Sequence, residues 1–186
     1  ALDASNYVST QWEELAKTNL KDPKANEKAK AFLKQFARLA FRKPLTDDLE
    51  KLYVQRPLET TPDLQAGIKK GVLLILKSQR FLFRELALDG DQYDVASRLS
   101  FALWDSIPNE ELITLAGSGK LKTADEIRKH VLEKMMNDTR SQAKIRGFLH
   151  HWLKTDQARD AEKDPKRFPG FDAAIISDLR TSLDLM

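Results

Sequence analysis

The stretch VASRLSFALWDSIPNEEL, residues 95–112, is the most informative part of this chain. Its first ten residues are apolar on nearly every side of a helix, with Val95, Leu99 and Leu103 on one face. Pro108 then opens a second helix, whose acidic first turn suits the positive end of the helix dipole. A helix that is apolar almost all round packs on more than one side. The stretch therefore predicts the middle of a helical core that contains no reactive group.

The same helical periodicity runs through the rest of the chain, and the alternating pattern of strands is nearly absent. Proline, glycine and capping residues divide the pattern into segments. We therefore predict an all-α fold, an irregular bundle of about eight to nine helices. The expected helices cover about residues 5–18, 24–43, 46–54, 61–83, 92–105, 108–117, 123–136, 138–153 and 171–186.

A polar segment that contains glycine, ALDGDQYD, interrupts the apolar pattern at residues 87–94. It predicts a boundary between two packed helical subdomains, residues 1–88 and 91–186. We expect the helices of Ala66–Phe83 and Val95–Trp104 to form the interface between these subdomains, because both are strongly apolar.

The C-terminal half carries a further apolar stripe. Ile145, Phe148, Leu149 and Trp152 recur at the spacing i, i+3, i+4 and i+7, which places them on one helix face. The last predicted helix runs to Met186 without a stop signal, so we expect the second subdomain to be truncated there.

The composition excludes several classes of cofactor site. The chain has 186 residues and no cysteine, which excludes disulfides, iron–sulfur clusters and covalently attached haem within it. No apolar window is long enough to span a membrane. The first residues, ALDASNYVST, show no signal peptide, but a mature or trimmed chain would lack one too, so the compartment stays open.

Positive charge is concentrated in one segment. Residues 21–43 contain eight Lys and Arg residues, and Lys30, Lys34, Arg38 and Arg42 recur every four residues on one side of a helix. Such a stripe is either a solvated helix face or a site for anions or nucleic acid. Because interleaved aromatic residues, a glycine-rich loop and a recognition-helix pattern are missing, the solvated face is favoured and nucleic acid is not expected as a partner.

Three arginines flank strongly apolar segments, where a guanidinium group needs a partner. They are Arg80, Arg84 and Arg98. Asp94 lies four residues before Arg98, so an ion pair on the helix is the default prediction. A site for an anion or a protein partner is the alternative.

The remaining motifs have structural explanations. The GSGK sequence at Gly117–Lys120 lacks the spacing and the preceding strand of a phosphate-binding loop, and it fits a turn after a helix. His150 and His151 are adjacent, whereas metal ligands on one helix lie three or four residues apart. The carboxylate pairs lie in first turns of helices, where the dipole favours them. We therefore assign no catalytic, cofactor-binding or metal-ligating residue.

Three stretches together resemble one family: FARLAFRKPLTDDLEKLY at 36–53, AGIKKGVLLILKSQRFLFRE at 66–85 and DVASRLSFALWDSIPNEELITLAGSGKL at 94–121. A fourth, FLHHWLKTD followed by FPGFDAAIISDLRTSL, adds support. They are similar to the central helical modules of planctomycete-type multidomain proteins of unknown function that are associated with cytochrome c modules. The resemblance implies a fragment of a longer exported chain, with haem c in other modules and none in this one.

Three functions follow from these observations. The first is a non-catalytic scaffold or binding module of an extracytoplasmic, haem-associated protein, with other modules of the same chain as its partners. The second is part of an enzyme whose cleft between the subdomains is completed by missing modules; whether the parent is an enzyme is left open. The third is a basic module that binds anions or nucleic acid.

Overall fold

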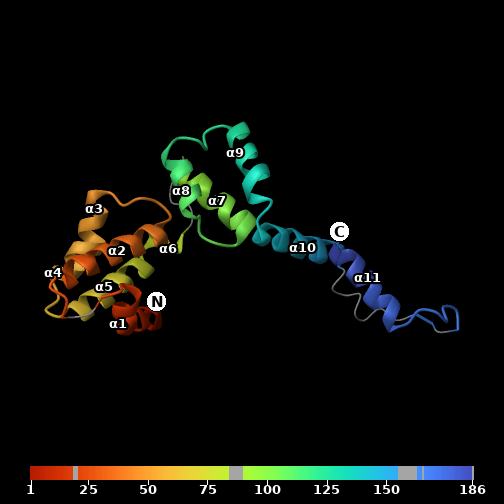
Figure 1. Cartoon of the computed structure of the whole chain (residues 1–186), viewed down its shortest axis with the longest axis horizontal. Helices are drawn as coiled ribbons and strands as arrows, with labels where there is room; N and C mark the ends of the chain where they lie inside the picture. Colours follow the sequence, from red (N-terminus) through yellow and green to blue (C-terminus); the bar gives the residue numbers. More distant parts are fainter. Residues whose placement is uncertain (19–20, 84–89, 155–162, 165, 186) are drawn as a thin grey trace. The chain divides into compact units, whose positions relative to one another are not determined.

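The computed structural model describes residues 1–18, 21–83, 90–154, 163–164 and 166–185, and these residues form helices and no strand. The predicted all-α fold is confirmed over this part of the chain. It contains ten continuous helices, nine of them with seven or more residues, when each π-helical turn is counted together with the α-helices that adjoin it. No helix in the described part is both long and apolar enough to cross a bilayer. In chain order (Figure 1) the helical elements are α1 (Leu2–Leu15), α2 (Ala25–Phe41), α3 (Asp47–Glu50), the π-helical turn η1 (Lys51–Gln55), α4 (Arg56–Glu59), α5 (Leu64–Lys77), α6 (Gln79–Leu82), α7 (Gln92–Trp104), α8 (Glu110–Gly117), α9 (Ala124–His130), the π-helical turn η2 (Val131–Met135), α10 (Thr139–Leu153) and α11 (Ala173–Leu185).

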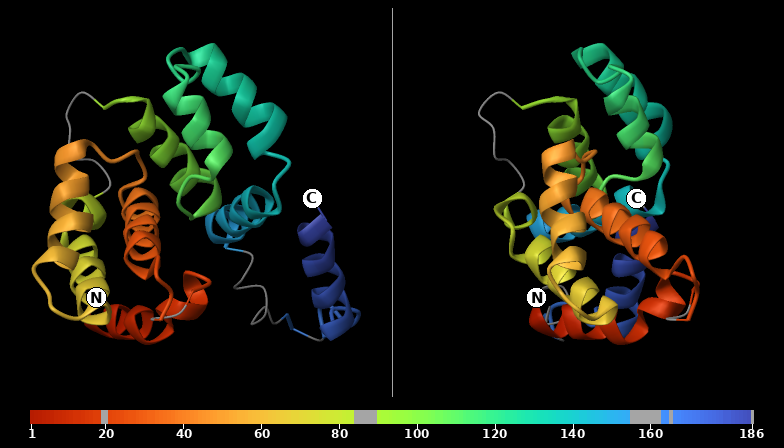
Figure 2. Two further views of the ribbon diagram at one scale, coloured as in Figure 1. Left: turned by 60° about the vertical axis from the view of Figure 1, so that its left-hand side comes forward. Right: turned by 90° about the vertical axis from the view of Figure 1, so that its left-hand side faces the viewer.

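The chain forms two compact units, and the first comprises Ala1–Phe101 and Ser106–Ala124. Helix α5 packs against α1, α2 and α4, and α1 lies across one end of the α2–α5 pair (Figure 2). The centre of this unit is a cluster of apolar side chains, and their burial supplies most of the driving force for folding. Its buried members are Trp12, Ala25, Ala29, Leu33, Ala37, Phe41, Val54, Ile68, Val72 and Ile75.

A glycine permits the close approach of α5 to α2. A Cβ atom on Gly71 would lie 2.8 Å from Cδ1 of Leu33, which is closer than two carbon atoms can approach. The missing side chain at position 71 therefore leaves the space that the Leu33 methyl groups fill. This is the reason for a glycine inside an otherwise strongly apolar helix.

The predicted interface between α5 and α7 stays a prediction. The core that contains the buried residues of α5 draws on α1, α2 and η1, and among the described residues it includes none from α7. Apolar periodicity identifies the buried face of a helix but not the helix that covers it. The predicted boundary at residues 88–91 stays a prediction, and residues 84–89 lie outside the described part of the chain.

Two boundaries differ from their predictions in the first unit. The segment from Arg56 to Glu59, predicted as part of a connector, continues the preceding helix because the π-helical turn η1 carries the backbone into α4. Helix α5 begins after Asp63 rather than at Thr61, since the Asp63 carboxylate accepts a hydrogen bond from the Ala66 N–H at 2.8 Å. An aspartate that binds the third N–H of a helix is a strong N-cap.

The second unit comprises Ala102–Asp105 and Asp125–Met186. Asp138 caps α10, because its carboxylate accepts a hydrogen bond from the Arg140 N–H at 2.9 Å. Asp172 similarly accepts hydrogen bonds from the first N–H groups of α11, at 2.9 and 3.0 Å. Local polar residues therefore determine where both C-terminal helices begin.

Candidate functional site

The basic stripe on α2 is partly neutralised within the first unit. The Lys34 ammonium lies 2.6 Å from a carboxylate oxygen of Glu50, and Arg38 donates two hydrogen bonds to Glu110, at 3.0 and 2.6 Å. Lys30 is exposed. Two of the four cations are therefore already paired, which reduces the positive field that an anion or nucleic acid would meet.

Arg42, the fourth member of the stripe, is buried with 6% of its surface exposed. It ends α2 in the left-handed conformation, with φ of 60°. Its guanidinium donates to the main-chain carbonyls of Ala40, Arg80 and Phe83 at 3.0–3.1 Å. These bonds join the end of α2 to α6, so the placement of Arg42 favours a structural role over contact with a ligand.

Two of the three arginines that flank apolar segments lie on separate elements. Arg80 is exposed on α6, Arg98 is exposed on α7, and Arg84 lies outside the described residues. Asp94, the predicted partner of Arg98, accepts a hydrogen bond from the Asp91 N–H at 3.1 Å and lies 3.6 Å from the Lys43 ammonium. The Asp94–Arg98 pair and the role of these arginines stay predictions.

The GSGK segment is a turn after a helix, as predicted. Helix α8 ends at Gly117, Gly119 has φ of 76°, and the Lys120 N–H donates to the carbonyl of Leu115 at 3.0 Å. The turn therefore satisfies the last carbonyls of α8. Over the described residues, no group of three or more His, Asp or Glu side chains could hold a metal ion.

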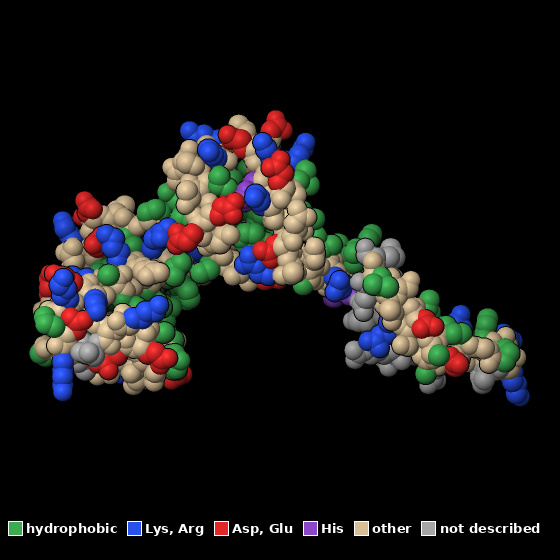
Figure 3. Space-filling view, in the orientation of Figure 1, with side chains coloured by type: hydrophobic (Ala, Val, Ile, Leu, Met, Phe, Trp, Pro, Cys, Tyr) green, Lys and Arg blue, Asp and Glu red, His purple; other side chains and the backbone are tan. Residues whose placement is uncertain are grey.

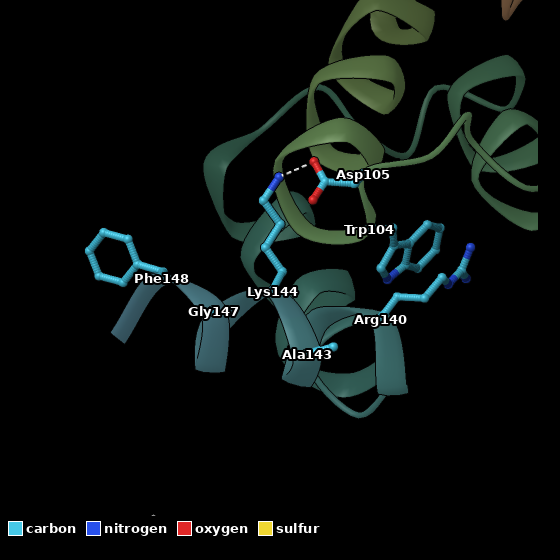
Figure 4. A pocket seen from close by; sticks show the side chains of 7 residues that line it. All are labelled: Trp104, Asp105, Arg140, Ala143, Lys144, Gly147 and Phe148. Atoms are coloured by element: carbon cyan, nitrogen blue, oxygen red, sulfur yellow. Dashed lines mark hydrogen bonds and ion pairs between the residues drawn. The ribbon is translucent and has the colours of Figure 1, made fainter. Parts of the chain in front are cut away.

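A shallow hollow of about 590 Å³ lies in the second unit, between the end of α7 and the outer side of α10 (Figure 4). The Arg140 guanidinium lies 4.2 Å from the centre of the Trp104 ring, and Lys144 is paired with Asp105. The remaining lining residues are Ala143, Gly147 and Phe148.

Arg140 is also held by Asp138 through hydrogen bonds from Nε and Nη2, at 2.9 and 2.7 Å. The pKa of Asp138 is lowered from 3.8 to about 2, first by the side-chain hydrogen bond from Arg140 and then by the bond from its N–H group. The pKa of Arg140 is raised, mainly by the same side-chain bond. Both cations of the hollow are therefore engaged with carboxylates of their own unit.

The most distinctive surface feature is apolar and lies on the C-terminal half of α10. Phe148 and Trp152 stack with ring centres 6.1 Å apart and an angle of 19° between their planes. They remain 63% and 66% exposed, and Leu149 and Leu153 are exposed beside them. We call these four residues the α10 apolar surface. Figure 3 shows hydrophobic side chains at the surface over the C-terminal helices.

The sequence identifies this apolar stripe but not its exposure. The periodicity of Phe148, Leu149 and Trp152 is that of a core-facing helix, and the structure leaves these side chains in contact with solvent. Monomeric proteins rarely expose contiguous apolar patches without a function. Basic residues such as Arg146, which is exposed, flank this face.

Comparison with known proteins places the C-terminal part of the chain in a family. Residues 91–186 match the model of PSD4, described as a protein of unknown function (DUF1592). The match begins at the first residue predicted for the C-terminal subdomain. No curated protein and no solved structure matches the chain. Because the matched residues make up just over half of the sequence, the chain belongs to the DUF1592 family of proteins of unknown function.

Proposed function

We propose that this chain is a non-catalytic helical scaffold or binding module of a larger, extracytoplasmic protein associated with haem c, and that it holds other modules of the same longer chain. The α10 apolar surface carries this proposal. Full burial of one large apolar side chain such as Phe148 contributes about 1.5–3 kcal/mol, so four such side chains favour association strongly.

The charged groups beside this surface support docking rather than a reaction. Lys144 pairs with Asp105, and Arg140 pairs with Asp138. A general acid or base needs a proton at a group whose pKa lies near the working pH. The lowered pKa of Asp138 moves that carboxyl away from such a role.

The haem context rests on the resemblance to cytochrome c-associated proteins. The family match over residues 91–186 supports only the assignment to a domain of unknown function, and the haem association is a proposal. With no cysteine in the chain, thioether-linked haem would be attached to other modules. An absorption spectrum of the full gene product tests this context, and absence of a haem band would contradict it.

Hydrogen exchange tests the docking role itself. We expect the amides of residues 148–153 to exchange more slowly in the full gene product than in the 186-residue chain, because a partner module covers them. The amides of α9 serve as an internal control in the same unit. Equal exchange of residues 148–153 in both proteins would overturn the proposal.

The alternative of a basic binding site on α2 has less support. Lys34 and Arg38 are paired with carboxylates, and Arg42 is buried against main-chain carbonyls. A filter-binding assay with duplex DNA at low salt would reveal such a site through a steep loss of affinity as salt rises.

A further inference from the structure

We propose that the α10 apolar surface binds an amphipathic helix with acidic flanks, supplied by another module of the longer protein. This inference rests on the proposed function and adds the chemistry of the partner. Helix-in-groove recognition uses apolar anchors from one face of the incoming helix, and the charges around them determine which helix is accepted.

The surface has the shape that a helix requires. Phe148, Leu149, Trp152 and Leu153 lie at i, i+1, i+4 and i+5, so they form a ridge about one and a half turns long. Phe148 also lines the hollow beside α10 (Figure 4), and a Cβ atom on Gly147 would meet nothing within 4 Å. An anchor side chain of the partner therefore has space beside the ridge.

The exposed charges that α10 itself places beside the ridge are cationic. Helix α10 contains no Asp or Glu, the Asp105 carboxylate in the hollow is paired with Lys144, and one exposed cation lies near each end of the ridge along the helix. Arg146 lies three residues before Leu149, and Lys154 follows the last residue of α10; both are exposed and neither forms an ion pair with a described carboxylate. Partner helices with Glu or Asp beside their apolar face meet attraction at both cations, whereas helices with Lys meet repulsion.

The chain itself contains one helix of similar chemistry, which must be distinguished from an external partner. In α11, Ile175 and Leu179 are 39% and 52% exposed, and Asp172 and Asp178 lie beside them. Variants of α11 therefore belong in the test.

The experiment is titration calorimetry of the 186-residue chain with two synthetic helical peptides that share one leucine stripe and carry Glu or Lys elsewhere. We expect the Glu peptide to bind about tenfold more tightly than the Lys peptide at low salt. The difference should disappear at about 1 M salt, where the Debye length is about 3 Å. Equal affinities, tighter binding of the Lys peptide, or no binding would overturn the proposal.

Matched variants assign the site. Trp152→Ala should weaken binding of the Glu peptide at least tenfold, whereas Leu132→Ala, an exposed apolar residue of η2, should leave it unchanged. The double reversal Arg146→Glu with Lys154→Glu should abolish the preference for Glu, and Arg128→Glu with Lys129→Glu on α9 should preserve it. If Trp152→Ala binds the Glu peptide as tightly as the wild-type chain does, or if the Arg146/Lys154 double reversal keeps the preference for Glu, the assignment is overturned.

The variant Leu179→Asp distinguishes occupation of the α10 apolar surface by α11 from occupation by an external partner. We expect this variant to bind the Glu peptide with unchanged affinity. If binding occurs only in the variant, α11 already occupies the surface and the external partner is overturned. The exchange experiment on the full gene product is independent of the peptides, so failure of the acidic-helix chemistry and failure of the docking role are distinguishable.

Discussion

The contact between Gly71 and Leu33 leads to a quantitative prediction about packing in the first unit. Replacing Gly71 by Ala removes the helix penalty of glycine, a gain of about 1 kcal/mol. The new Cβ would lie 2.8 and 3.1 Å from the two Leu33 methyl groups, and overpacking of this kind costs about 1–3 kcal/mol. Gly71→Ala should therefore lower the free energy of unfolding by about 0–2 kcal/mol.

The effect of Gly71→Ala on the free energy of unfolding should change sign when the Leu33 side chain is removed. Leu33 is fully buried, so Leu33→Ala alone should cost about 2–5 kcal/mol. In that background Gly71→Ala should stabilise by about 1 kcal/mol, because no methyl group opposes the added carbon. The double-mutant cycle should give a coupling energy of about 1–3 kcal/mol.

Urea unfolding monitored by circular dichroism measures all four proteins of this cycle. Gly147→Ala is the matched control, since Gly147 also lies within a helix and its Cβ would meet nothing within 4 Å. If Gly71→Ala stabilises the chain as much as Gly147→Ala does while Leu33 is present, the steric reasoning is refuted.

Three further predictions concern polar groups. Arg42→Met should destabilise the first unit by about 2–4 kcal/mol, because three main-chain carbonyls lose a charged donor; a loss below about 0.5 kcal/mol in urea unfolding would contradict this. Asp63→Ala should cost about 1 kcal/mol through loss of the N-cap of α5, whereas Asp63→Asn should retain most of it. The lowered pKa of Asp138 means that its ionised carboxylate favours the folded state. The stabilisation of α10 by this carboxylate is therefore present above pH 3.8 and is lost as the pH falls toward 2. A carboxyl NMR titration should give the lowered pKa of Asp138, and the variant Arg140→Gln should raise that pKa.

Local sequence signals determined the helices and many of their ends. Pro44 follows the end of α2, Asp138 caps α10, and Gly119 takes the left-handed conformation after α8. These signals are reliable because each acts through its own backbone or through neighbours within four residues. The all-α class follows from the same local periodicity, without knowledge of which helices meet.

Tertiary structure decided which surfaces are covered and which polar groups are used. Burial of Arg42 depends on carbonyls about forty residues away in α6, and no local pattern encodes that approach. The apolar face of α5 is covered by α1 and α2, whereas the equally periodic face of α10 at Phe148 and Trp152 stays exposed. The physical reason is that burial is a property of two surfaces, and sequence periodicity describes only one of them.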